Sequence, residues 1–136
     1  MKEIKGNQTV YLEDYDVTVN KYLTYAQIQQ IANAVVAASA NDADDTWANR
    51  ETNVDMLVLY HATDIGKEKL EEIGHDALLT SGLIDAVRYR IENIYSVNDA
   101  IDYIENNQRV INKMLKSLPK VLEETKGLQD LMKKHG

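Results

Sequence analysis

The sequence contains no cysteine and no phenylalanine, one proline and six glycines in 136 residues. Without cysteine the chain has no disulfide framework and no thiolate chemistry, which fits an intracellular protein. Eight tyrosines and one tryptophan supply all of its aromatic surface. A buried tyrosine needs water or a partner for its hydroxyl group. We therefore expect an aliphatic core with aromatic rings near its edges or at interfaces.

Long apolar runs and an excess of positive charge are also missing. No segment approaches the roughly 20 consecutive apolar residues that span a bilayer, and residues 1–16 lack the apolar stretch of a secretory signal. The formal net charge is −7, which disfavours direct binding to a nucleic-acid backbone. We therefore expect neither a membrane partner nor direct contact with nucleic acid.

The charge is unevenly distributed along the chain. Residues 1–64 carry four basic and ten acidic residues, residues 65–112 carry five and nine, and residues 113–136 carry six and three. An acidic body with a basic tail can support head-to-tail contacts or orient docking on a partner. The alternative is a solvated, lysine-rich helix end.

A β-hairpin is predicted at the N-terminal end. Residues 9–12 are β-prone, "EDYD" is typical of a turn, and the alternating pattern resumes over 17–23. Val17 and Val19 point to one side and Tyr22 to the other. An isolated hairpin is marginal in water, so it must pack on the helices or join another chain's sheet. Val17, Val19 and Tyr22 are therefore candidate interface residues.

The following region, residues 24–95, shows the signals of a helical core. Thr24 and Gln27 have the spacing of a capping box. The apolar residues after them follow the i, i+3, i+4, i+7, i+8 pattern of an amphipathic helix: Ile28, Ile31, Ala32, Val35 and Val36. A second helix is predicted from near Thr46 to before Gly66. A short helix then ends at Gly74, and another is interrupted or restarted at residues 81–82.

The most regular pattern lies near the C-terminal end, where Ser96 is predicted to cap a long helix. Apolar residues are spaced 4, 3, 4, 3, 4, 3, with one polar member: Val97, Ile101, Ile104, Gln108, Ile111, Leu115 and Leu118. This heptad spacing lasts about three heptads, the lower limit for a coiled coil. Two interpretations stay open: one long helix packed on its own domain, or a self-pairing helix whose register Gln108 sets. Ile101, Ile104, Gln108, Ile111 and Leu115 are candidate interface residues.

These patterns together predict one mostly helical α+β domain over residues 1–136. It comprises a short N-terminal β-hairpin (1–23) and a helical core (24–95), followed by the long helix and a basic C-terminal helix (96–136), so that the hairpin precedes a bundle of about five helices. Ser117 and Pro119 allow a kink or a restart between the last two helices.

Signals of catalysis and of cofactor or metal binding are weak. The sequence has none of the phosphate-binding glycine motifs, the HExxH metal motif or the GxSxG nucleophile motif. His61 and Asp64 share a helix face but lack a third ligand. Glu51 and Asp55 are four residues apart, a spacing that is common on solvated helix faces. We predict no enzymatic activity, no catalytic residue, no cofactor and no metal.

Three stretches carry a resemblance to a known group of proteins. "VTVNKYLTYAQIQQIANAVV", "WANRETNVDMLVLYHATDI" and "LLTSGLIDAV" are similar to small structural or assembly proteins of tailed phages and prophages of Gram-positive bacteria. The resemblance covers about residues 8–90, and its motifs are apolar. It implies a structural or assembly role with other phage proteins or further copies of the chain as partners. It places the chain in the host cytoplasm during assembly, or in the virion.

Two functional hypotheses follow, from different classes. In the first, the chain is a non-enzymatic phage structural or assembly protein, a virion component or a tail or head assembly factor, that acts through protein–protein contacts. In the second, it is an acidic inhibitor of a host defence system that imitates nucleic-acid phosphates with clustered carboxylates: Asp42, Asp44, Asp45, Glu51 and Asp55. A small-molecule-binding or catalytic domain is a third, less supported class.

Trp47, another candidate interface residue, begins a helix that becomes apolar on more than one face from Val54 onward. We expect the second half of this helix to be buried and its Trp47 end to lie at an edge. Trp47→Ala should therefore reduce stability or partner binding and abolish no chemistry. Urea unfolding and a binding assay test this prediction, and a catalytic loss in a protein that still folds would contradict it.

Overall fold

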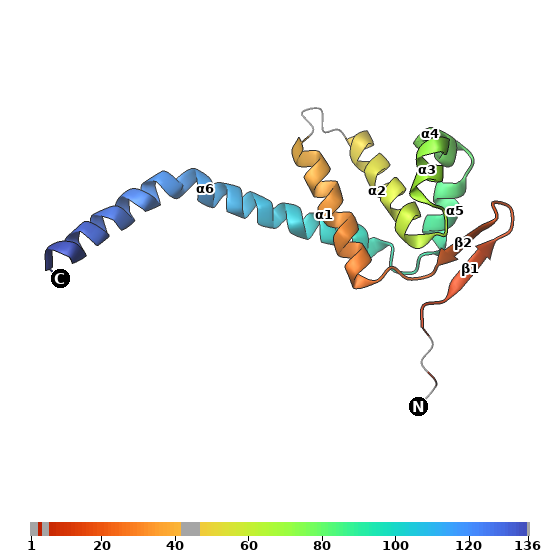
Figure 1. Ribbon diagram of the computed structural model, residues 1–136, viewed down its shortest axis with the longest axis horizontal. Coiled ribbons are helices and arrows are strands. Elements are labelled where there is room, and N and C mark those ends of the chain that lie inside the picture. Colours follow the sequence, from red (N-terminus) through yellow and green to blue (C-terminus); the bar gives the residue numbers. More distant parts are fainter. Residues whose placement is uncertain (1–2, 4–5, 42–46, 136) are drawn as a thin grey trace. The chain divides into compact units, whose positions relative to one another are not determined.

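The computed structural model describes residues 3, 6–41 and 47–135, apart from the side chains of 40–41, 47–48 and 118–135. The chain divides into two compact units, residues 1–102 and residues 103–136. Six helices are present among the described residues, five of them seven residues or longer, and they follow a two-stranded hairpin. The predicted α+β class, mostly helical with an N-terminal hairpin, is confirmed (Figure 1).

The hairpin pairs β1 (Thr9–Leu12) with β2 (Val17–Asn20) in an antiparallel sheet, with Leu12 opposite Val17. The second strand ends at Asn20, before the predicted limit at residue 23, because other groups take over the backbone hydrogen bonds there. The Tyr22 N–H donates to Oδ1 of Asn7 at 3.2 Å. Beyond Asn20, the Asn7 side chain therefore replaces a strand partner for the backbone of Tyr22.

The first helix, α1 (Tyr25–Asn41), begins at the predicted capping box. The Thr24 N–H donates to Oε1 of Gln27 at 3.0 Å, and the Gln27 N–H donates to Oγ1 of Thr24 at 3.1 Å. These reciprocal bonds satisfy backbone donors that the first turn leaves without partners. The predicted apolar stripe faces the core, where Ile31 and Val35 are fully buried.

The central element of the first unit is α2 (Trp47–Ala62), which contacts α1, α3 (Lys67–Ile73), α4 (His75–Thr80) and α5 (Leu83–Arg90) (Figure 1). Its buried apolar residues occupy two adjacent faces: Val54, Val58, Leu59 and Ala62. The expected burial of its second half is therefore confirmed. The side chain of Trp47 lies outside the described residues.

The hairpin packs against the helices of its own chain. Val19 forms an isolated bridge with Thr63, directly after α2. The Asp64 N–H donates to the Thr18 carbonyl at 3.2 Å, and the Thr18 N–H donates to Oδ1 of Asp64 at 3.0 Å. Of the two arrangements considered for the hairpin, the structure shows packing on the helices.

A second connection joins the end of the hairpin to the loop before α6. The Leu23 N–H donates to Oδ1 of Asn93, and Nδ2 of Asn93 donates to the Leu23 carbonyl, both at 2.9 Å. Next to this pair, the Glu92 N–H donates to the Lys21 carbonyl at 2.7 Å. The Asn93 side chain thus satisfies the backbone donor and the backbone acceptor of buried Leu23, which lies 70 positions earlier in the sequence.

The last helix, α6 (Tyr95–His135), differs from the prediction at two places. It begins one residue before Ser96, which therefore lies in the first turn and is not the cap; the Ser96 N–H donates to the Asn93 carbonyl at 3.0 Å. The helix also continues through Pro119 without a restart. Proline removes one backbone donor there, so the carbonyl four residues earlier, at Leu115, loses its helical partner.

Two glycines with positive φ separate the short helices. Gly74 (φ 85°) lies between α3 and α4, and Gly82 (φ 84°) between α4 and α5. Both stops were predicted from the sequence. At Gly82 the backbone also approaches the hairpin turn, where the Tyr15 hydroxyl donates to the Ser81 carbonyl at 2.9 Å. A Cβ atom at position 82 would lie 3.0 Å from the Tyr15 hydroxyl oxygen.

Gly82→Ala should therefore lower the free energy of unfolding by about 1–2 kcal/mol, because a side chain disfavours left-handed backbone and crowds Tyr15. Gly66→Ala is the matched control, since Gly66 has an ordinary φ of −71° and open space around a new Cβ. We expect a change within about 0.5 kcal/mol for that variant. Urea denaturation of both proteins measures the difference, and equal effects would contradict the strain at Gly82.

Candidate functional site

The predicted interface residues of the first unit have different surroundings. Val17 and Val19 are 5% and 0% exposed, and Ile101 is 2% exposed. All three are part of the core of the first unit. Tyr22 is half exposed, whereas the side chain of Trp47 lies outside the described residues.

The remaining four predicted residues share one side of α6. Ile104, Gln108, Ile111 and Leu115 are 4, 3 and 4 residues apart, which places them along one face of a helix. We call these four residues the α6 face. Ile104 is half-buried, and the other three are exposed. This apolar stripe, interrupted only by Gln108, is the candidate interface.

A long stretch of α6 has exposed side chains. Every side chain from Asn106 to Ser117 is exposed, including Ile111 at 52%, Leu115 at 56% and Met114 at 65%. Isolated helices are marginal in water, and most helical stability in proteins comes from packing an apolar face. This stretch of α6 has such a face, and its side chains are exposed.

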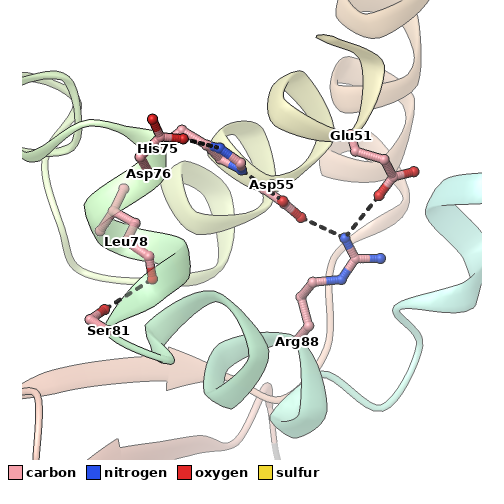
Figure 2. Close-up of polar contacts among 7 residues, drawn as sticks. All are labelled: Glu51, Asp55, His75, Asp76, Leu78, Ser81 and Arg88. Atoms are coloured by element: carbon pink, nitrogen blue, oxygen red, sulfur yellow. Dashed lines mark hydrogen bonds and ion pairs between the residues drawn. The ribbon is translucent and has the colours of Figure 1, made fainter. Parts of the chain in front are cut away.

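A second candidate is a polar cluster in the first unit (Figure 2). Asp55 from α2 is only 6% exposed. Its Oδ1 accepts a hydrogen bond from Nη1 of Arg88 in α5 at 2.6 Å, and its Oδ2 lies 3.0 Å from Nε2 of His75 in α4. Glu51, one turn earlier on α2, lies 3.9 Å from the same Arg88 nitrogen. One carboxylate therefore joins three helices.

The charged groups of this cluster pair with one another. A buried carboxylate is tolerated when it is paired and hydrogen-bonded, and Asp55 has both an arginine and a histidine as partners. The Nδ1 atom of His75 is 3.9 Å from Oδ1 of the exposed Asp76. The cluster lines a surface depression of about 500 Å³, but its charged groups are directed at one another. We interpret it as a structural connection.

Sequence reasoning assigned Glu51 and Asp55 to a solvated helix face. For Asp55 this interpretation is wrong, because the helix turns that residue toward α4 and α5. A local signal existed: Asp55 directly follows Val54 in the apolar half of the helix, where an acidic residue implies a cationic partner. The partner itself, Arg88, is 33 residues away and could not be found from spacing.

The predicted weak ligand pair, His61 and Asp64, has other contacts. The Asp64 carboxylate accepts from the hairpin at Thr18, and the His61 ring packs edge-on against Tyr60 with centroids 5.0 Å apart. Burial lowers the pKa of the His61 imidazole below its ordinary value, because a charged ring is disfavoured away from water. Within the described residues, no group of three or more potential ligands is placed to hold a metal ion.

Comparisons with known proteins identify no relative: no protein-family model, curated protein or solved structure matches the chain. The resemblance to phage structural and assembly proteins therefore stays a prediction. Among the residues that the structure describes, no helix is both long enough and apolar enough to cross a membrane. The function must be inferred from the surfaces of the chain itself.

Asp55→Ala should lower the free energy of unfolding by about 3 kcal/mol, because it leaves Arg88 and His75 without their shared partner in a largely buried position. Glu51→Ala is the matched control on the same helix. Its ion pair is longer and a third exposed, so we expect a loss below about 1 kcal/mol. Thermal or urea unfolding measures both, and equally small losses would show that the cluster contributes little to stability.

Proposed function

We propose that this chain is a non-enzymatic structural or assembly protein of a tailed phage or prophage, acting through protein–protein contacts. The observation that carries the contact part of this proposal is the exposed α6 face, with Ile111 and Leu115 each more than half exposed. The phage assignment rests on the sequence resemblance over residues 8–90. The site of action is the host cytoplasm during assembly, or the virion.

The energetics of the α6 face favour a binding role. Full burial of one large aliphatic side chain contributes about 1.5–3 kcal/mol. Ile111 and Leu115 lie four residues apart on the α6 face, so a partner that covers both gains this contribution twice. Exposed apolar residues scattered singly need no explanation, whereas a contiguous stripe is typical of an interaction surface.

The alternative, an acidic inhibitor that imitates nucleic acid, receives less support. Such mimicry needs carboxylates that are exposed to the target. Asp55 is buried and paired with Arg88 and His75, and Glu51 lies beside the same arginine. The other carboxylates named for this hypothesis, Asp42, Asp44 and Asp45, lie outside the described residues. Two of the five carboxylates, Asp55 and Glu51, thus make contacts inside the first unit.

The test combines two measurements on the chain expressed with the phage or prophage that encodes it. Mass spectrometry of purified particles and of affinity-captured assembly intermediates should detect the chain together with virion proteins. Leu115→Asp should reduce this recovery at least tenfold, because it places a charge in the apolar stripe.

The control for this experiment is Val110→Asp. Val110 is on the same helix and is 58% exposed, but it lies about 100° around the helix from Ile111 and off the α6 face. This variant should keep wild-type recovery. Absence of the chain from particles and from every captured intermediate would contradict the proposal. Equal losses for both variants would contradict the role of the α6 face.

A further inference from the structure

We infer that the pocket between the hairpin turn and the helices α3 and α4 binds a small organic cation, an ammonium group joined to an apolar body. The hairpin turn, the segment after α2, the helices α3 and α4 and the start of α5 line this pocket, all within the first unit. The inference goes beyond the proposed function and does not depend on it, because the α6 face takes no part in the pocket.

The first observation is the size of the pocket and its apolar base. Its volume is about 580 Å³, and small-molecule sites have volumes of about 300–1,000 Å³. Val17, Leu78 and Leu83 line the pocket and are each at most 6% exposed. Ile73 also lines it and is 40% exposed. A ligand with an apolar body would remove this exposed surface of Ile73 from water, which is favourable.

The second observation is that two carboxylates line the same pocket, each with one oxygen available. Oδ1 of Asp16 accepts a hydrogen bond from the Tyr11 hydroxyl, and Oδ1 of Asp64 accepts one from the Thr18 N–H at 3.0 Å. Among the described residues, neither Oδ2 atom has a hydrogen-bond partner. The existing bonds therefore orient both carboxylates, and each second oxygen can accept from another donor.

The two carboxylates lie close enough to affect one neighbouring group. The pKa of the Tyr11 hydroxyl is raised above its ordinary value, first by its hydrogen bond to Asp16, then by desolvation and by the negative charges of Asp16 and Asp64. Nearby negative charges disfavour the tyrosinate. The same two charges would favour a cation bound beside them.

The basic group of the pocket does not pair with these carboxylates. Lys69 of α3 lines the pocket, but the described residues include no ion pair between Lys69 and Asp16 or Asp64. By contrast, the buried carboxylate of Asp55 already has Arg88 and His75 as partners. With two carboxylates and one ammonium group the pocket keeps a negative charge, so it favours a cationic ligand over an anionic one.

The lining of the pocket favours an organic cation over a metal ion. In the part of the chain that the structure describes, no group of three or more potential ligands is placed to hold a metal ion, whereas Ca²⁺ takes about six to eight oxygen ligands. An ammonium group has three donors and needs only a few acceptors. Its carbon body can contact the apolar residues of the pocket, such as Ile73 and Leu83.

Phenethylamine is a suitable probe, because it joins an ammonium group to an aromatic ring. Added to the isotope-labelled full chain, it should shift the backbone amide NMR signals of Tyr15, Asp64 and Gly66 saturably, with a Kd on the order of 1 mM for a ligand of this size. Phenethyl alcohol, its neutral analogue, should bind at least tenfold more weakly, and the anionic analogue hydrocinnamate should give no saturable shift. No saturable shift with phenethylamine, or equal affinity for the alcohol, would overturn the inference.

Asp16→Asn and Asp64→Asn test the two carboxylates while keeping an Oδ1 acceptor at each position. Asparagine also tolerates the left-handed φ of 53° at position 16, and the dispersion of the NMR spectrum reports whether each variant folds. Each variant should weaken phenethylamine binding at least fivefold.

Asp14→Asn is the matched control. It removes one negative charge from the same turn, but Asp14 does not line the pocket, so the affinity should change less than twofold. Equal weakening by all three variants would reveal only a general loss of negative charge. That result would overturn the inference, as would unchanged affinity in both Asp16→Asn and Asp64→Asn.

Discussion

The packing of α2 is the constraint on which the rest of the first unit depends. Its apolar second half is covered by α1 on one side and by three short helices on the other. Asp55 introduces a charge into this helix, and a charge cannot be buried there without a partner. His75 of α4 and Arg88 of α5 both contact this carboxylate, and the same two helices bury Leu78 and Val87 in the core. Packing and electrostatics therefore select the same arrangement.

The hairpin depends on the same helix. Two short strands cannot form a stable sheet alone, and β2 completes its hydrogen bonding at the end of α2, where Asp64 bonds to Thr18 in both directions. Asn93 then holds the chain after β2 beside the beginning of α6. The loops of the first unit are thus fixed by a small number of hydrogen bonds whose partners are distant in the sequence.

This distance explains which features could be predicted from the sequence. The capping box at Thr24, the stop at Gly82 and the amphipathic stripe of α1 depend on neighbours within a few residues, and all were found. The pairing of Asp55 with Arg88 depends on the tertiary fold and was missed. The start of α6 was placed two residues late, because Ser96 was taken as the cap and the helix begins at Tyr95. The sequence left a kink or a restart open at Pro119, and the backbone continues as one helix through that residue.

The heptad pattern of α6 shows most clearly where sequence reasoning ends. Val97 and Ile101 follow the same spacing as Ile111 and Leu115, yet the first two are buried in the first unit and the last two are exposed. Periodicity identifies which face of a helix is apolar, but it does not identify what covers that face. In the first unit, other elements of the same chain cover Val97 and Ile101. The buried carboxylate of Asp55 on α2 is paired with Arg88 and His75. In the second unit, Ile111 and Leu115 repeat the same apolar spacing on side chains that are more than half exposed, and the proposed protein–protein contact depends on this face.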